Sequence, residues 1–588
     1  MANKISGSDA IMKTLYDWHI DHLYGYPGGS FDSTMNAIHN WKDKINYVQV
    51  RHEEAGALAA SAEYKLTGKI GVCFGSAGPG AVHLMNGLYD AKYDKVPMLA
   101  IIANVPTGRQ NIDFFQAFDE APWFRDVAVW DHQATTKEAL PAMIDEGIRQ
   151  AYAKKGPAIV IVPKDFGWAE IDDTFQTNYS NHVAPVYPAP DKKYVGEAVK
   201  LLKEAKSPMV YFGIGAKDAS AELKEFSEKF KTPLVSSVLA KGIVEDAYPA
   251  YMGSTGRVAP KTGVDLGWST DLIVWVGNNV PFSIFLFNPK AKVIQIDVDS
   301  EKIGKRHHVD VPLLADAKQA LRALIDAGET RSESAFYKAA LANKENWENW
   351  LSSFKDSDET PVRPEPIFDA INKAASDKAV FAVDVGNVNI NFARLIKLHD
   401  DQKWTTSGLY ATMGYGAPAS LAAATVYPDR DVYSLSGDGG FAMMCEEVLT
   451  QYKYKMHVIN IVFSNETLGY IEAEQTDDSH QPLSGVDLPD SDWAKIGEGM
   501  GAKGYTVRTK KEFEDALADA KSVEGPVVID VKLTHEMPFT TEHMDLNSDE
   551  FVKKYKAQGL KPFSYFLKKA ESEASASSED ATSGASEN

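Results

Sequence analysis

The sequence predicts an α/β protein of three consecutive domains, each with a mostly parallel sheet flanked by helices. The first observation behind this is a recurring unit: a short β-branched run leads into a glycine-rich turn and then a helical stretch, as in 69–75, 76–80 and 81–93. Such runs, bounded by turn residues, are typical of parallel βαβ units. The second is that the unit recurs in three blocks, and 588 residues suffice for about three or four domains.

The first predicted domain spans residues 1–183 and leads into a linker. Its expected strands lie near 45–50, 69–75, 97–104 and 158–163. The stretch 177–193 contains three prolines among polar residues, a composition typical of linkers.

The second predicted domain spans 191–345, with strands expected near 209–215, 271–277 and 293–298. The charged, tryptophan-containing stretch 327–362 indicates a helical connector. The third predicted domain spans 360–548, with strands expected near 379–386, 431–437, 457–464 and 526–533. Residues 570–588 are rich in Ser, Ala and Glu, and this polar, acidic composition predicts a disordered tail.

Charge and cysteine content limit the function classes. Asp and Glu outnumber Lys and Arg by 82 to 61, which argues against nucleic acid as a partner because phosphate binding needs clustered cations. Only two cysteines are present, which fits a reducing compartment. The first residues lack the apolar run of a signal peptide, and no stretch of about eighteen apolar residues exists. We therefore expect a cytoplasmic protein without a membrane partner.

The most specific motif lies in the third block. A predicted strand runs into Gly437-Asp438-Gly439-Gly440, and the next strand ends at Asn465, 27 residues after Asp438. That interval is about one βαβ crossover. Parallel strands end at the same sheet edge, where ligands bind, and neighbours lie about 4.8 Å apart. Both side chains could therefore meet on one Mg²⁺, which prefers oxygen ligands. The tripeptide alone is more simply an ordinary turn, but the interval and flanking strands favour the metal site.

This pattern resembles the diphosphate-binding motif of thiamine-diphosphate enzymes. The resemblance implies that Asp438 and Asn465 hold Mg²⁺, with the backbone carbonyl of Thr467 as a third ligand. It also implies that thiamine diphosphate lies against a set of glycines, namely Gly437, Gly439 and Gly440.

Thiamine catalysis needs a carboxylate that activates the aminopyrimidine ring, and Glu53 is the candidate. It stands where a predicted strand gives way to a helix, in Arg51-His52-Glu53-Glu54. A helix-dipole role is the alternative for any acid in a first helical turn. The segment RHEEAGA nevertheless resembles the glutamate segment of this family, and it lies at the expected place relative to the cofactor-binding Gly28, Gly29 and Ser30. The resemblance assigns the role to Glu53 rather than Glu54. In the family this glutamate acts on cofactor bound by another subunit, which implies a homo-oligomer, commonly a dimer of dimers.

Further site residues follow from the same resemblance. His83 would lie near the pocket, with a satisfied helix-face histidine as the alternative. Phe115 and Gln116 match a pair beside the thiazolium and the flavin. Met413 matches the apolar residue that bends the cofactor, with a core methionine as the alternative.

Four more residues complete the predicted third-domain site. Gly386 and Asn387 match a second diphosphate-contacting turn. Glu474 aligns with an active-site glutamate and Tyr470 with a cofactor-contacting position, although the relatives carry Phe at the position of Tyr470 and Lys at that of Glu472. A solvated helical glutamate is the alternative for Glu474.

The middle block resembles a domain that holds FAD. Gly213 and Gly215 follow a predicted strand, but the third glycine of the dinucleotide fingerprint is missing. Acids at the end of another strand suit ribose hydroxyls, and an arginine could pair with a diphosphate. The alternative is a middle domain without flavin. The residues implied in FAD binding are Gly213, Gly215, Arg257, Asn278, Asn279, Asp297, Asp299 and Asp316.

From about residue 8 to about residue 568 the chain resembles the pyruvate oxidases, which use thiamine diphosphate, Mg²⁺ and FAD. The resemblance implies that pyruvate, phosphate and oxygen are converted to acetyl phosphate, carbon dioxide and hydrogen peroxide. One alternative is a carboligase resembling acetolactate synthase, in which FAD has no redox role. Another is a quinone-linked, membrane-associated oxidase, which the acidic tail opposes. A scaffold without activity is the third, and the set of Glu53, Asp438 and Asn465 argues against it.

Overall fold

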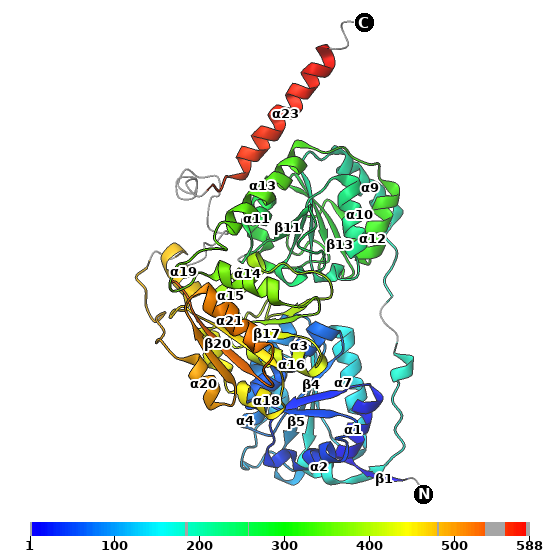
Figure 1. Ribbon diagram of the computed structural model, residues 1–588. Coiled ribbons are helices and arrows are strands. Elements are labelled where there is room, and N and C mark those ends of the chain that lie inside the picture. The colour runs from blue at the N-terminus through cyan, green and yellow to red at the C-terminus, as the bar shows by residue number, and fades with distance from the viewer. Residues whose placement is uncertain (1–2, 183–185, 257, 479–480, 536–558, 584–588) are drawn as a thin grey trace.

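The computed structural model describes residues 3–182, 186–256, 258–478, 481–535 and 559–583. Over these ranges the chain forms three six-stranded sheets and one two-stranded sheet (Figure 1). The pairs within the six-stranded sheets are parallel. The predicted fold class, three mostly parallel sheets flanked by helices, is confirmed.

The first sheet has the strand order β3-β2-β4-β5-β7-β6. Its strands are β2 (His22–Gly25), β3 (Asn46–Gln49), β4 (Gly71–Gly75), β5 (Met98–Asn104), β6 (Trp130–Gln133) and β7 (Pro157–Pro163). The helices of this domain are α1 (Gly7–Asp17), α2 (Asp32–Asn40), α3 (Glu53–Thr67), α4 (Pro79–His83), α5 (Met85–Tyr93), α6 (Glu120–Phe124), α7 (Leu140–Lys154) and α8 (Lys164–Trp168). The short strands β1 (Lys4–Ser6) and β8 (Glu170–Asp172) pair antiparallel and join the two ends of the domain.

The second sheet has the order β11-β10-β9-β12-β13-β14. Its strands are β9 (Pro208–Phe212), β10 (Leu234–Ser236), β11 (Tyr251–Ser254), β12 (Leu272–Val276), β13 (Lys292–Asp297) and β14 (Val311–Leu314). The helices are α9 (Lys192–Glu204), α10 (Ser220–Phe230), α11 (Lys261–Ser269), α12 (Ala317–Ala327) and α13 (Ala335–Ser352). The predicted helical connector is therefore α13, and it packs into this domain's core through Phe336, Ala339 and Ala340.

The third sheet has the order β16-β15-β17-β18-β20-β19. Its strands are β15 (Val380–Val383), β16 (Lys403–Thr405), β17 (Val432–Gly437), β18 (Val458–Ser464), β19 (Lys503–Val507) and β20 (Val527–Lys532). The helices are α14 (Pro364–Ala374), α15 (Asn387–Leu395), α16 (Gly416–Val426), α17 (Asp438–Met444), α18 (Glu447–Lys453), α19 (Gly469–Ala473), α20 (Trp493–Gly499) and α21 (Lys510–Ala520). The last described helix, α23 (Phe563–Ser583), packs on α13 of the middle domain.

The first and third domains share a core, at the place where α3 and α16 lie side by side (Figure 1). Both helices are rich in alanine, and Ala57, Ala60, Ala419 and Ala422 belong to one buried cluster. Small side chains let the two helices approach closely. This contact fixes the start of α3, where Glu53 stands, relative to the third sheet.

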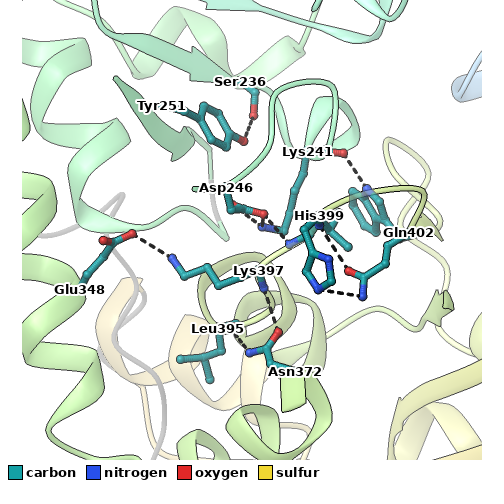
Figure 2. Close-up of polar contacts among 12 residues, drawn as sticks. Ser236, Lys241, Asp246, Tyr251, Glu348, Asn372, Leu395, Lys397, His399 and Gln402 are labelled. Carbon is teal, nitrogen blue, oxygen red and sulfur yellow. Dashed lines mark hydrogen bonds and ion pairs between the residues drawn. The ribbon is translucent and has the colours of Figure 1, made fainter. Parts of the chain in front are cut away.

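The middle and third domains meet through a buried ion pair (Figure 2). The Lys241 ammonium lies 2.7 Å from each carboxylate oxygen of Asp246, and that carboxylate accepts the Leu398 backbone N–H at 2.9 Å. The Lys241 carbonyl accepts the Trp404 indole N–H at 2.8 Å. The junction therefore holds the segment after β10 against the loop that leads into β16.

The structure differs from the prediction at the C-terminus. The expected disordered tail over 570–588 is helical as far as Ser583, because α23 continues through it. Phe563, Phe566 and Ala570 anchor the start of this helix on the middle domain, and Figure 1 shows its later part projecting away from that domain. Alanine and glutamate are good helix formers, so a helix nucleated by the anchored turns can extend through this composition.

No helix within the described ranges is both long and apolar enough to cross a membrane. Cys73 is buried and Cys445 partly buried, and both are free thiols. Burial raises the pKa of the Cys73 thiol to about 12.

Candidate active site

The carboxyl ends of β17 and β18 bring the predicted metal-binding residues to one sheet edge. β17 ends at Gly437, and Asp438 begins α17. One oxygen of the Asp438 carboxylate accepts the Gly439 N–H, and the other accepts the Glu466 N–H, each with an N–O distance of 2.9 Å. Because Glu466 directly follows Asn465, this contact holds the two turns together.

A cavity of about 1420 Å³ lies at this edge and extends between the third and middle domains. Asp438, Asn465 and Thr467 all line it. The predicted cofactor-binding residues that also line it are Gly215, Asn278, Asn279, Asp297, Asp299, Asp316, Gly386, Asn387, Met413, Gly437, Gly439, Gly440 and Tyr470. The structure therefore brings the predicted residues of two domains together around one space.

The charge at Asp438 is suited to a cation. Burial raises the pKa of Asp438, and the neighbouring Asp530 raises it further. The bonds that this carboxylate receives from the described residues come from uncharged backbone amides. A buried acid without a counter-charge is costly, and a divalent cation would supply that charge. Gly386 and Gly437 leave open space where a side chain would stand, so these turns fit a ligand that contacts their backbone.

Asp384, which begins the predicted diphosphate-contacting turn that contains Gly386 and Asn387, organises the turn that carries Met413. One carboxylate oxygen accepts the Gly414 N–H at 2.9 Å, and the other accepts the Gly416 N–H at 3.2 Å. A Cβ at Gly440 would lie 2.9 Å from the Asp384 carboxyl carbon. The sequence alone did not indicate that Asp384 binds the backbone of the Met413 turn, because the two segments lie about 30 residues apart.

Buried charges also fasten this region to the first domain. Lys65 of α3 lies 2.8 Å from Asp90 and 2.7 Å from Asp94. The Asp94 carboxylate accepts the backbone N–H groups of Gly408 (2.9 Å) and Leu409 (2.7 Å). The loop that leads to Met413 is therefore held by the first domain of the same chain.

Glycine turns of the middle domain pack in direct contact. A Cβ at Gly215 would lie 2.8 Å from the Gly277 Cα, and one at Gly213 would lie 2.5 Å from the Gly277 carbonyl oxygen. Gly277 itself has φ +55°, a conformation that favours glycine. Gly213 packs against Gly277 and does not line the cavity, so its contact with FAD stays a prediction. Among the described residues, the buried Asn278 side-chain nitrogen has no acceptor within hydrogen-bond distance, and Asn278 lines the cavity.

The three acids predicted to bind FAD, Asp297, Asp299 and Asp316, differ in their positions and in their hydrogen bonds. Asp297 ends β13, and burial raises its pKa. Asp299 lies two residues further, and its N–H bonds the Asp297 carboxylate at 3.0 Å. Asp316 caps α12 by accepting the Gln319 N–H at 3.2 Å, so it also has a structural role. Arg257 lies outside the described residues.

The first domain holds a second group of predicted residues around Glu53. Glu53 begins α3 and is 8% exposed. Its carboxylate lies 2.9 Å from His83 Nδ1, and the His83 ring stacks on His52 with centroids 4.4 Å apart. A Cβ at Gly80 would lie 3.0 Å from the other Glu53 oxygen. The carboxylate is therefore held by His83 in a tight site.

The neighbouring Glu54 is already engaged. It accepts the Asn86 side-chain amide at 2.6 Å, and that amide also bonds the Thr412 hydroxyl at 2.8 Å. This bridge joins the first domain to the Met413 turn. Glu54 is thus used in a contact between two domains, whereas the contact of Glu53 with His83 lies within the first domain.

The turn after β2 lies beside the Glu53 group. The Ser30 hydroxyl accepts the Ala77 N–H at 2.7 Å. A Cβ at Gly28 would lie 2.4 Å from the Ser76 Cβ, whereas Gly29 has nothing within 4 Å of that position. Gly28 is thus needed for close packing, and Gly29 leaves room for a ligand.

Three further predicted catalytic residues stand apart from the cavity. Phe115 is 77% exposed, and Gln116 has φ +61° and packs on Gly78. Glu474 begins a π-helical turn, Glu474–Asp478, directly after α19. None of these three lines the cavity, and neither do Glu53 and His83. In the described chain, the predicted catalytic residues of the first domain therefore do not line the cavity that contains the predicted metal edge of the third domain.

Glu120 is a buried acid beside Gly78 that sequence reasoning did not single out. It begins α6, is 1% exposed, and burial raises its pKa to about 8, opposed in part by the Gly78 backbone amide. We expect the free energy of unfolding of Glu120→Gln to rise relative to that of the wild type as pH rises. The folded state keeps the Glu120 proton from pH 4.5 to about 8 while the unfolded state loses it, so wild-type stability falls over this window.

The neutral glutamine does not titrate, so the stability difference should grow by on the order of 4 kcal/mol across the window and then level off. Thermal unfolding of both proteins at pH 5, 7 and 9 measures this. A melting-temperature difference that stays constant across these pH values contradicts the expectation.

The comparisons with known proteins agree with the three-domain architecture. Residues 5–123, 195–324 and 384–531 match the N-terminal TPP binding domain, the central domain and the C-terminal TPP binding domain of thiamine pyrophosphate enzymes. The chain is 42% identical to pyruvate oxidase of Lactiplantibacillus plantarum over 579 residues, which is 96% of each chain. It is 36% identical to YdaP of Bacillus subtilis, which is thought to contain thiamine pyrophosphate, over 92% of this chain and 93% of that protein.

A third relative is the acetolactate synthase large subunit of Corynebacterium glutamicum, 29% identical over 90% of this chain and 86% of that protein. The three domain matches together span most of the chain, in the order of its three sheets. This chain belongs to the thiamine pyrophosphate enzyme family.

Proposed function

We propose that this chain oxidatively decarboxylates pyruvate, using thiamine diphosphate, Mg²⁺ and FAD, with phosphate and oxygen as co-substrates. The products would be acetyl phosphate, carbon dioxide and hydrogen peroxide. The observation that carries the proposal is the single cavity lined both by Asp438 and Asn465 and by the glycine turns and acids of the middle domain. The relative named pyruvate oxidase, at 42% identity over 96% of the chain, supports the choice of substrate.

The third domain would hold the metal and the diphosphate. Asp438, Asn465 and the Thr467 carbonyl offer oxygen ligands, which Mg²⁺ prefers. Gly439 and Gly440 let the backbone approach the phosphates, and Met413 lines the same cavity.

Bound thiamine diphosphate would act as the electron sink for decarboxylation. Glu53 would hold a proton at the aminopyrimidine ring, and His83, 2.9 Å away, would fix the carboxylate. Because Glu53 does not line the cavity of its own chain, we propose that it serves the cavity of a partner subunit in a homo-oligomer, as a dimer of dimers.

Bound FAD would accept the two electrons released from the substrate. Gly215, Asn278 and Asn279 would lie along it, and Asp297 and Asp299 are suited to ribose hydroxyls. Tyr470 lines the same cavity at its third-domain end, which would place its hydroxyl between the metal edge and the flavin region.

Purified protein supplied with pyruvate tests the function. We expect a flavin absorbance spectrum, and peroxide formation that depends on added phosphate and is matched by acetyl phosphate. Peroxide without phosphate dependence would remove the acetyl phosphate step, and a colourless protein that forms no peroxide would overturn the proposal.

A carboligase is the second candidate, because relatives at 29% identity are named acetolactate synthases. The same assay separates the two functions. Acetolactate formed from pyruvate without oxygen uptake would favour the carboligase, in which FAD has no redox role.

A further inference from the structure

β3 leads directly to Glu53, and it is an edge strand of the first sheet. One side of an edge strand has backbone groups without a neighbouring strand. α18 of the third domain contacts that side. The Tyr454 hydroxyl accepts the Gln49 N–H at 2.9 Å and donates to the Tyr47 carbonyl at 3.1 Å. The last part of β3 is therefore bonded to the end of α18.

Glu447, the first residue of α18, continues this contact toward Glu53. One oxygen of its carboxylate accepts the Arg51 N–H at 2.7 Å and the His52 N–H at 3.3 Å. The other oxygen accepts the Thr450 hydroxyl at 2.6 Å. The two amides that Glu447 binds belong to the two residues directly before Glu53, so this side chain spans the turn between β3 and α3.

The burial of Glu447 argues that these bonds matter. The side chain is fully buried, and burial raises its pKa to about 7. Burying a carboxyl group costs free energy, and an apolar side chain at this position would avoid that cost. We therefore attribute the presence of an acid here to the hydrogen bonds that it makes. Without the carboxylate, the Arg51 and His52 amides would each lose their acceptor, and a donor left without a partner away from water is unfavourable. The turn would then move to satisfy them.

We propose that Glu447 is a positioning residue for Glu53: from the third domain, it fixes the backbone turn that aims the activating carboxylate. This inference rests on the proposed role of Glu53. It gives α18 a role separate from metal and diphosphate binding, although α18 begins only nine residues after Asp438.

Two substitutions test the proposal. Glu447→Ala removes both acceptors, whereas Glu447→Gln keeps one carbonyl oxygen that can accept the same amides. With thiamine diphosphate and Mg²⁺ bound, we expect Glu447→Ala to slow proton exchange at carbon 2 of the thiazolium at least tenfold, because small displacements of a catalytic group can cost about 100-fold. The dissociation constant for thiamine diphosphate should change less than threefold. Glu447→Gln should stay within threefold of the wild type in both measurements.

Amide hydrogen exchange of the protein without added cofactor gives an independent readout. Arg51 and His52 should exchange faster in Glu447→Ala, but not in Glu447→Gln. Gln451→Ala is the matched control, because Gln451 is equally buried on α18 and bonds Ser420 and Asn460 instead of β3. It should leave carbon 2 exchange and the Arg51 and His52 amides unchanged.

Wild-type carbon 2 exchange in Glu447→Ala would overturn the proposal. An equal loss in Glu447→Gln or in Gln451→Ala would also overturn it, because the effect would then come from charge or from general loosening of the helix. Glu53→Gln separates this inference from the proposed function. If Glu53→Gln leaves carbon 2 exchange unchanged, the role of Glu53 fails; if only Glu53→Gln slows it, the role of Glu447 fails.

Discussion

Replacing Asp438 with alanine is expected to abolish both the retention of thiamine diphosphate and the turnover of pyruvate. The Asp438 carboxylate stands at the end of β17 and bonds the backbone of the turn that carries Asn465. Its removal takes away the proposed anionic ligand for Mg²⁺ and the hydrogen bonds that join the two turns. A bound cation bridges protein and phosphate oxygens at such sites, so cofactor affinity and activity should fall together.

The measurement is the amount of thiamine diphosphate that remains after gel filtration with and without Mg²⁺, together with pyruvate consumption. Asp369→Ala is the matched control, because Asp369 is also a buried acid of the third domain but bonds Lys355 and Lys373 instead of facing the cavity. The control should keep the cofactor. If Asp438→Ala retains both cofactor and turnover, the metal assignment is wrong.

The strands that could be predicted from sequence were the long apolar ones. β5, β7 and β18 are each seven residues long and fully buried, so their apolar runs are clear. Seven strands of the six-stranded sheets were missed, namely β2, β6, β10, β11, β14, β16 and β19. β2 is His22–Gly25 and β16 is Lys403–Thr405, and such short runs carry no periodicity.

Tertiary packing, not local propensity, places these short strands. Gly25 ends β2 against the Phe74 ring, where a Cβ would lie 2.7 Å from ring atoms. β16 pairs with β15 at the edge of the third sheet, and Trp404 within it bonds the Lys241 carbonyl of the middle domain. Neither contact leaves a signal in the neighbouring sequence.

In the candidate site, too, some residues could be predicted from the sequence and others could not. The edge at Asp438 and Asn465 could be predicted because one crossover interval and two strand ends carry it. Glu447 could not, because its partners Arg51 and His52 lie about 395 residues away in sequence. Residues that face the cofactor directly belong to local motifs, whereas residues that position them act across domain contacts that only the folded chain creates.

Replacing Glu53 with glutamine is expected to lower turnover by about 10²–10⁴-fold, the usual contribution of a positioned acid–base group. Glutamine has nearly the same shape and can still bond His83, but it cannot exchange a proton with the aminopyrimidine ring. Retention of thiamine diphosphate should not change, because the proposed diphosphate contacts lie in the third domain. Glu54→Gln is the matched control, since Glu54 bonds Asn86 and should tolerate the amide with little loss.

Mixed oligomers of Glu53→Gln and Asp438→Ala subunits extend this prediction to the assembly. Each variant alone should be inactive. If Glu53 serves a partner's cavity, a dimer of one subunit of each kind has one intact site, built from Glu53 of the Asp438→Ala subunit and Asp438 of the Glu53→Gln subunit. Equal co-expression should then restore about a quarter of wild-type activity in a symmetric dimer. If each chain completed its own cavity, every mixed oligomer would stay inactive, because each subunit would carry one defect in its only site.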